Sequence, residues 1–62
     1  MRGQLLRGKL VAVVDGPAMV LEVRGQERQL PLVVSVALPW IAENMDKVIT
    51  VLVEDGKITQ IA

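Results

Sequence analysis

Residues 38–45, Leu-Pro-Trp-Ile-Ala-Glu-Asn-Met, decide how the rest of the chain is interpreted. The apolar side chains of this stretch recur at spacings of three, one and three residues, which is the period of a helix. They are Leu38, Ile41, Ala42 and Met45. Pro39 suits the first turn of a helix, because a backbone N–H is not needed there. The stretch therefore predicts a short helix at residues 39–45.

Short runs rich in Val, Leu and Ile lie on both sides of this helix, separated by Gly and Pro. Such runs predict β-strands. Asp55-Gly56 favours a two-residue hairpin turn of type I′. Pro31 cannot donate to a strand ladder, so it restricts its strand to a sheet edge or a bulge. The expected strands are residues 6–14, 18–23, 27–34, 47–53 and 57–61.

Five short strands in 62 residues are too few for two separate sheets. Closure into a small barrel would remove the exposed sheet edges and enclose one core. A helix between the third and fourth strands is typical of the OB-fold. We therefore expect one mainly β domain over residues 1–62, a five-stranded antiparallel barrel of OB-like order β-β-β-α-β-β. An SH3-like or Sm-like barrel is the alternative, because one short helix distinguishes these topologies.

The residue inventory excludes several kinds of site. The chain has no Cys, His or Tyr, and Ser35 is its single serine. A thiolate or imidazole is thus missing both as a metal ligand and as a catalytic base or nucleophile. Seven basic and seven acidic residues give no net charge, so there is no overall attraction to nucleic acid or to an anionic membrane. We expect no enzymatic activity, no cofactor and no metal site.

Length and apolar content together favour self-association into a homo-oligomer. Apolar residues make up 52% of a chain whose length allows a marginal core, and no disulfide can stabilise it. Both faces of the strand at residues 47–53 are apolar, whereas a half-exposed strand alternates. We expect its outward face to form an intermolecular interface. The residues assigned to this interface are Ile49, Val51 and Val53, together with Trp40.

Trp40 is the one aromatic residue of the chain. At the start of the predicted helix it either closes the barrel core or anchors the interface. The main functional hypothesis is a non-enzymatic module that assembles through an apolar strand face and binds a second copy of itself or another protein. In a second hypothesis, backbone amides and Arg24 or Arg28 hold an oxyanion or small ligand between subunits.

A nucleic-acid-binding ring is the third hypothesis. Residues 1–28 hold five basic and three acidic residues, an excess that a ring of subunits would multiply. Against it, single-stranded nucleic acid is bound by stacking on several aromatic side chains, and this chain has one. No apolar stretch reaches the length needed to cross a bilayer, and no leader segment is visible. We therefore expect a cytoplasmic protein without a membrane partner.

Two stretches resemble parts of known families. Arg7-Gly8-Lys9-Leu10-Val11 is similar to the molybdate-binding Mop modules, oligomeric OB-like barrels that hold an oxyanion between subunits. Their Ser-Ala-Arg-Asn entry motif is replaced here by Met1-Arg2-Gly3-Gln4. Residues 46–58 resemble the end of the AbrB-type DNA-binding fold, without the basic residues in the preceding helix. Each likeness covers a part of the chain, and we assign the chain to neither family.

Overall fold

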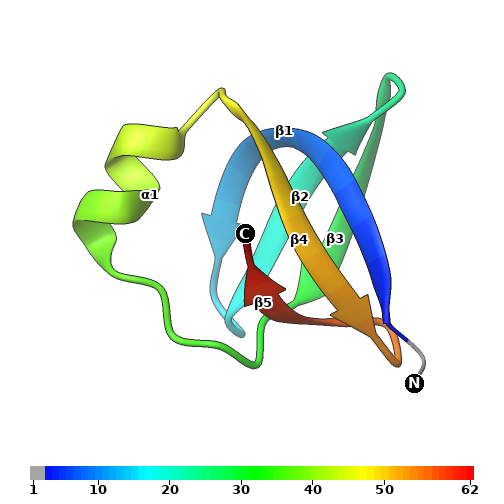
Figure 1. Cartoon of the computed structure of the whole chain (residues 1–62). Helices are drawn as coiled ribbons and strands as arrows, with labels where there is room; N and C mark the ends of the chain where they lie inside the picture. Colours follow the sequence, from blue (N-terminus) through cyan, green and yellow to red (C-terminus); the bar gives the residue numbers. More distant parts are fainter. Residues whose placement is uncertain (1–2) are drawn as a thin grey trace.

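The computed structural model describes residues 3–62, which form five strands and one short helix (Figure 1). In chain order the elements are β1 (Gln4–Val14), β2 (Ala18–Val23), β3 (Gln26–Pro31), α1 (Leu38–Asn44), β4 (Val48–Glu54) and β5 (Lys57–Ile61). The structure confirms a mainly β fold with a helix between the third and fourth strands. No helix within residues 3–62 is long and apolar enough to cross a membrane.

The strands form one antiparallel sheet in the order β3-β2-β1-β4-β5. β1 is strongly curved, so that its first half pairs with β4 and its second half with β2 (Figure 1). The sheet is not closed: between its two outer strands the structure has an isolated parallel bridge from Leu32 to Ile58. The expected closed barrel is therefore not confirmed.

The strand boundaries match the sequence expectation at β2 and β5 and differ elsewhere by a few residues. β1 begins at Gln4 rather than at residue 6, and β3 ends at Pro31 rather than at residue 34. The N–H of Leu32 still donates to the carbonyl of Pro17 (2.9 Å), which continues the register of β3 with β2. The chain changes partners at Val33, whose N–H donates to the carbonyl of Ile58 (3.0 Å), and the pairing with β2 ends there.

The core lies on the concave side of the curved sheet. Its buried members come from all five strands and from Leu32, just after β3. They are Leu10, Met19, Leu21, Leu30, Leu32, Ile49, Val51 and Ile58. Partly buried side chains pack around this cluster, Val53 and Trp40 among them.

The face of β4 assigned to an interface is the core face, so that expectation is wrong. Ile49 and Val51 belong to the core, and Val53 packs against it. Val48, on the opposite face, is 57% exposed. Both faces of β4 are apolar, so the two-residue period alone could not decide which one is buried. Contact with Leu10, Leu21 and Ile58 on the concave side decides it.

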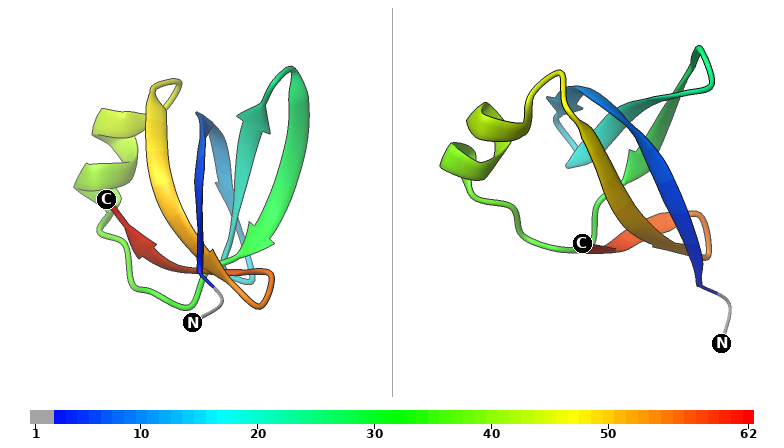
Figure 2. Two further views of the ribbon diagram at one scale, coloured as in Figure 1. Left: turned by 45° about the vertical axis from the view of Figure 1, so that its right-hand side comes forward. Right: turned by 45° about the horizontal axis from the view of Figure 1, so that its top comes forward.

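Helix α1 lies beside the sheet, on the side away from the β2–β3 hairpin (Figures 1 and 2). None of its residues is fully buried, and its N-cap residue, Ala37, makes no side-chain capping bond. The side chain of Asn44 donates to the carbonyl of Trp40 over 2.8 Å. Asp46, two residues after the end of the helix, has a left-handed backbone conformation with φ of 64°.

Candidate functional site

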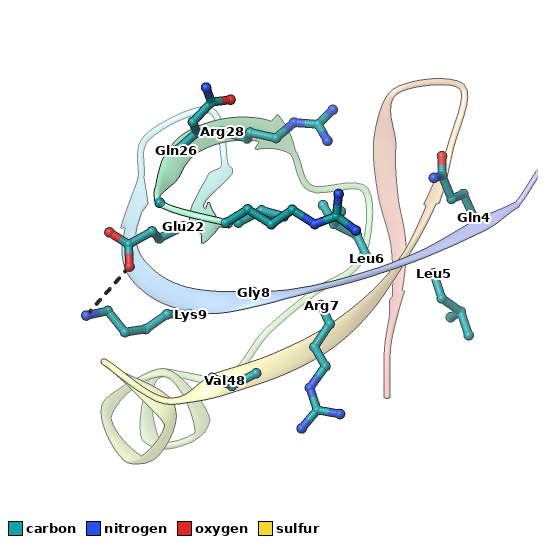
Figure 3. A pocket seen from close by; sticks show the side chains of 13 residues that line it. Gln4, Leu5, Leu6, Arg7, Gly8, Lys9, Glu22, Gln26, Arg28 and Val48 are labelled. Carbon is teal, nitrogen blue, oxygen red and sulfur yellow. Dashed lines mark ion pairs between the residues drawn. The ribbon is translucent and has the colours of Figure 1, made fainter.

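A cleft of about 890 Å³ opens where β1 parts from β2 (Figure 3). β1 pairs with β2 from Lys9 onward, and its residues 4–8 pair with β4 alone. One edge of residues 4–8 therefore faces the β2–β3 hairpin across the cleft. We call this cleft the notch. Its lining consists of Gln4, Leu5, Leu6, Arg7, Gly8, Lys9, Glu22, Val23, Arg24, Gly25, Gln26, Arg28 and Val48.

Backbone groups of β1 point into the notch at every second residue. Leu10 bonds toward β4: its N–H donates to Lys47 (2.9 Å), and its carbonyl accepts from Asp46 (2.8 Å). Since hydrogen-bonding direction alternates along an antiparallel strand, Leu6 and Gly8 also bond toward β4, and Leu5 and Arg7 point the other way. Within residues 3–62, the N–H and C=O groups of Leu5 and Arg7 have no strand partner on that edge.

The notch gathers most of the positive charge of the protein. Four of its lining residues are basic and one is acidic. Because the whole chain has seven basic and seven acidic residues, the remainder carries three basic and six acidic ones. The zero net charge thus conceals an excess of three positive charges at the notch and an equal negative excess elsewhere. The basic residues of the notch are Arg7, Lys9, Arg24 and Arg28.

Most of this positive charge is not neutralised locally. The Lys9 Nζ lies 4.0 Å from Glu22 Oε1, and both side chains are more than two-fifths exposed, so water screens this pair. It is the one ion pair within residues 3–62. The guanidinium groups of Arg7, Arg24 and Arg28 therefore have no carboxylate partner within 4.0 Å there. Three exposed guanidinium groups without partners are available to an anion.

The turn of the β2–β3 hairpin positions Arg24. Arg24 and Gly25 have φ values of 53° and 80°, as the two central residues of a type I′ turn require. Asn, Asp and Gly are preferred at the first of these positions, because larger side chains are strained at positive φ. The second hairpin follows the preference, with Asp55 at 53° and Gly56 at 75°. The first hairpin has an arginine at its strained position.

The structure distributes the site residues predicted from the sequence over three separate places. Arg24 and Arg28 both line the notch, as the hypothesis of an anion site requires. Ile49 and Val51 lie in the core instead. Trp40 is half-buried in α1 and lines a separate small cleft with Val34, Ser35, Val36, Ala37 and Ile61. It is neither a fully buried core residue nor a neighbour of the notch.

Sequence reasoning did not single out Arg7 and Lys9 as site residues. The available signal was the basic excess of residues 1–28, which holds every basic residue of the notch. The free edge of β1 could not be predicted from the sequence, because it depends on the residue at which the pairing between β1 and β2 ends.

No family model, curated protein or solved structure matches this chain. The groups that line the notch suit recognition: guanidinium and ammonium groups bind anions, and unpaired backbone groups form hydrogen bonds.

Proposed function

We propose that the protein is a non-enzymatic binding module that holds a polyanionic partner in the notch. The observation that carries this proposal is the collection of Arg7, Lys9, Arg24 and Arg28 around one cleft with a single carboxylate, Glu22. Like charges gathered in a concave surface raise the local potential and attract oppositely charged ligands. The absence of Cys, His and Tyr from the sequence further supports binding over catalysis.

The spread of the cationic side chains favours an extended ligand over a single oxyanion. Arg28 lies on the hairpin side of β1, whereas Arg7 extends to the other side, past β4 (Figure 3). A lone oxyanion is bound by donors that converge on one point. Cationic groups on both sides of a strand suit a ligand with several negative charges along its length.

The strained position of Arg24 further supports a binding role. A residue kept at positive φ where Asn or Gly would be more stable costs folding free energy. Such a cost is typical of positions where the side chain serves recognition. Arg24 stands at the tip of the hairpin that forms one wall of the notch.

Titration of the 15N-labelled protein with sodium tripolyphosphate at low ionic strength tests this proposal. We expect the amide resonances of Arg7, Lys9, Arg24, Gly25 and Arg28 to shift together and the affinity to fall as salt is added, because salt screens exposed charges. The double variant Arg24→Glu, Arg28→Glu should abolish the shifts. Lys47→Glu, Lys57→Glu is the matched control, since it makes the same change in net charge away from the notch.

Equal loss of binding in the two double variants would overturn the proposal, because binding would then depend on net charge alone. Shifts centred on residues outside the notch would also overturn it. Circular dichroism of each variant verifies that it is folded.

We also propose that the sheet is a partly open barrel of OB-like order. The strand order β3-β2-β1-β4-β5, the helix between β3 and β4, and the parallel Leu32–Ile58 bridge between the outer strands support it. The OB-fold is itself a partly open five-stranded barrel. An experimental structure in which the outer strands lie apart at Leu32 and Ile58 would contradict this assignment.

Self-association into a homo-oligomer is a second candidate function. The interface would then be the exposed face of β4, which carries Val48, and not the buried face that carries Val51. On the outer face of β1 and β4, Leu5 is 69% and Val48 57% exposed, and Leu38 of α1 is 79% exposed. Large apolar side chains left in water favour burial against another protein surface. Light scattering on a sizing column at micromolar concentration tests this candidate. A mass several times 6.8 kDa that persists in high salt would support it, and a monomer would exclude it.

A further inference from the structure

Two features of the notch indicate what kind of ligand it binds. One is its unpartnered cationic side chains, and the other is an unpaired strand edge. Leu5 and Arg7 direct two N–H and two C=O groups into it. Residues 4–8 span about 17 Å at roughly 3.4 Å per residue, enough for a short extended segment to lie along them. The β2–β3 hairpin forms the opposite wall (Figure 3).

The hydrogen-bonding character of the edge distinguishes between classes of polyanion. Phosphate oxygens accept hydrogen bonds, so a phosphodiester chain would satisfy the N–H groups of Leu5 and Arg7 and leave their carbonyls unsatisfied. A peptide backbone offers both donors and acceptors at the spacing of the strand. The notch lining also lacks aromatic side chains, on which unpaired bases would stack.

We infer that the partner of the notch is an acidic peptide segment that binds as an additional β-strand along residues 4–8. This inference rests on the proposed function and names its ligand. Strand addition obtains affinity from main-chain hydrogen bonds and specificity from alternate side chains. Carboxylates on one face of the segment pair with Arg24 and Arg28, and an apolar residue on the other face contacts the exposed Leu5.

Charged residues beside a free strand edge also prevent edge-to-edge aggregation, and this is the competing explanation for the arginines. The two explanations differ in what they predict. A protective role requires that no strand binds to the edge. A recognition role requires that an extended acidic peptide binds and that its backbone contributes to the affinity.

A capped octapeptide of alternating Glu and Val tests the inference by titration against the 15N-labelled protein. Its matched control is the same sequence with every backbone nitrogen methylated, which keeps the four carboxylates and removes every N–H donor. We expect the methylated peptide to bind at least about tenfold more weakly, because several hydrogen bonds are lost. The amides of Leu5 and Arg7 should gain protection from hydrogen exchange with the unmethylated peptide alone.

The variant Leu5→Pro tests the main-chain hydrogen bonds by removing a donor from the protein instead of from the peptide. It removes an N–H that points into the notch and leaves the ladder with β4 intact, so a free edge tolerates it. Peptide affinity should fall several-fold relative to Leu5→Val, which keeps the N–H. If Leu5→Pro fails to fold, the pair of peptides still decides.

The outcomes separate this inference from the proposed function. If the two peptides bind equally well, or if single-stranded oligothymidylate binds more tightly than either, the inference is overturned while anion binding stands. Binding of tripolyphosphate with no binding of the acidic peptide overturns it as well and favours the protective role of the arginines. Failure of tripolyphosphate and both peptides to bind overturns the proposed function itself.

Discussion

Glu22 and Glu27 lie directly opposite each other in the ladder between β2 and β3. Like charges in directly opposed positions repel each other and destabilise a sheet. Lys9, which is opposite Glu22 on the neighbouring strand β1, offsets part of this repulsion from 4.0 Å away. Three strands thus place two carboxylates and one ammonium group next to one another, and of these Lys9 and Glu22 line the notch.

Replacing Glu27 by Gln should therefore stabilise the protein. We expect the free energy of unfolding to rise by about 0.5 kcal/mol, because one of the two opposed charges is removed. Urea denaturation measures the change, and the gain should shrink in 1 M salt, where screening already weakens the repulsion. The control is Glu43→Gln in α1, which removes the same charge away from this pair. An equal gain in the control would attribute the effect to net charge.

Gly8 allows β2 to approach β1 closely, and a side chain there should be destabilising. A Cβ atom at Gly8 would lie 2.9 Å from the carbonyl oxygen of Glu22 and 2.9 Å from Val23 Cγ2. Backbone cannot move aside without disturbing the ladder, so Gly8→Ala should cost about 1–3 kcal/mol. Gly3→Ala is the control, since the nearest atom to its Cβ, Leu52 Cδ1 at 2.9 Å, ends a flexible side chain. Comparable losses in the two variants would contradict this account.

The two faces of β4 should respond oppositely to a charge. Val51 is completely buried and Val48 is 57% exposed. We expect Val51→Asp to unfold the protein, because burying an unpaired carboxylate costs more than a small domain can supply. Val48→Asp should stay folded and, if the outer face mediates self-association, lower the solution mass. Circular dichroism and light scattering give the two readouts, and a folded Val51→Asp variant would mean that the core is assigned to the wrong face.

The variant Arg24→Asn should bind anions more weakly and be more stable than the original protein. Asn is tolerated at positive φ better than Arg, so we expect the free energy of unfolding to rise by about 0.5–1 kcal/mol. The same variant removes a guanidinium group from the notch and should weaken tripolyphosphate binding several-fold. Asp55→Asn in the other hairpin serves as control, because that turn already has a favoured residue. Unchanged stability in Arg24→Asn would show that the turn is not strained.

The positions of turns and strands were predictable because they depend on local chemistry. Asp55-Gly56 predicted its hairpin, and both residues have positive φ as a type I′ turn requires. Pro31 predicted a strand at a sheet edge, and β3 is an outer strand. The helix at residues 39–45 was predicted from spacing and found at Leu38–Asn44.

The direction of the faces and the shape of the site were not predictable in the same way. Val48 and Val51 are the same residue type, so the sequence pattern does not indicate which of them packs against Leu10 and Leu21 in the core. Arg24 and Arg28 could be grouped because one hairpin carries them. Adding Arg7 required the curvature of β1, which results from pairing with two different strands.

The separation of charge has a consequence for how the molecule behaves as a whole. The notch carries an excess of three positive charges, and the turns that hold Asp15 and Asp55 lie at the opposite end of the sheet from the tip of the β2–β3 hairpin (Figures 1 and 2). A particle of this kind has an electric dipole without a net charge. Near its pI of about 6.1 it should hardly migrate in an electric field, yet it should rotate in one and be retained by both cation- and anion-exchange resins at low salt. As it approaches an acidic surface, it would turn its notch forward before contact.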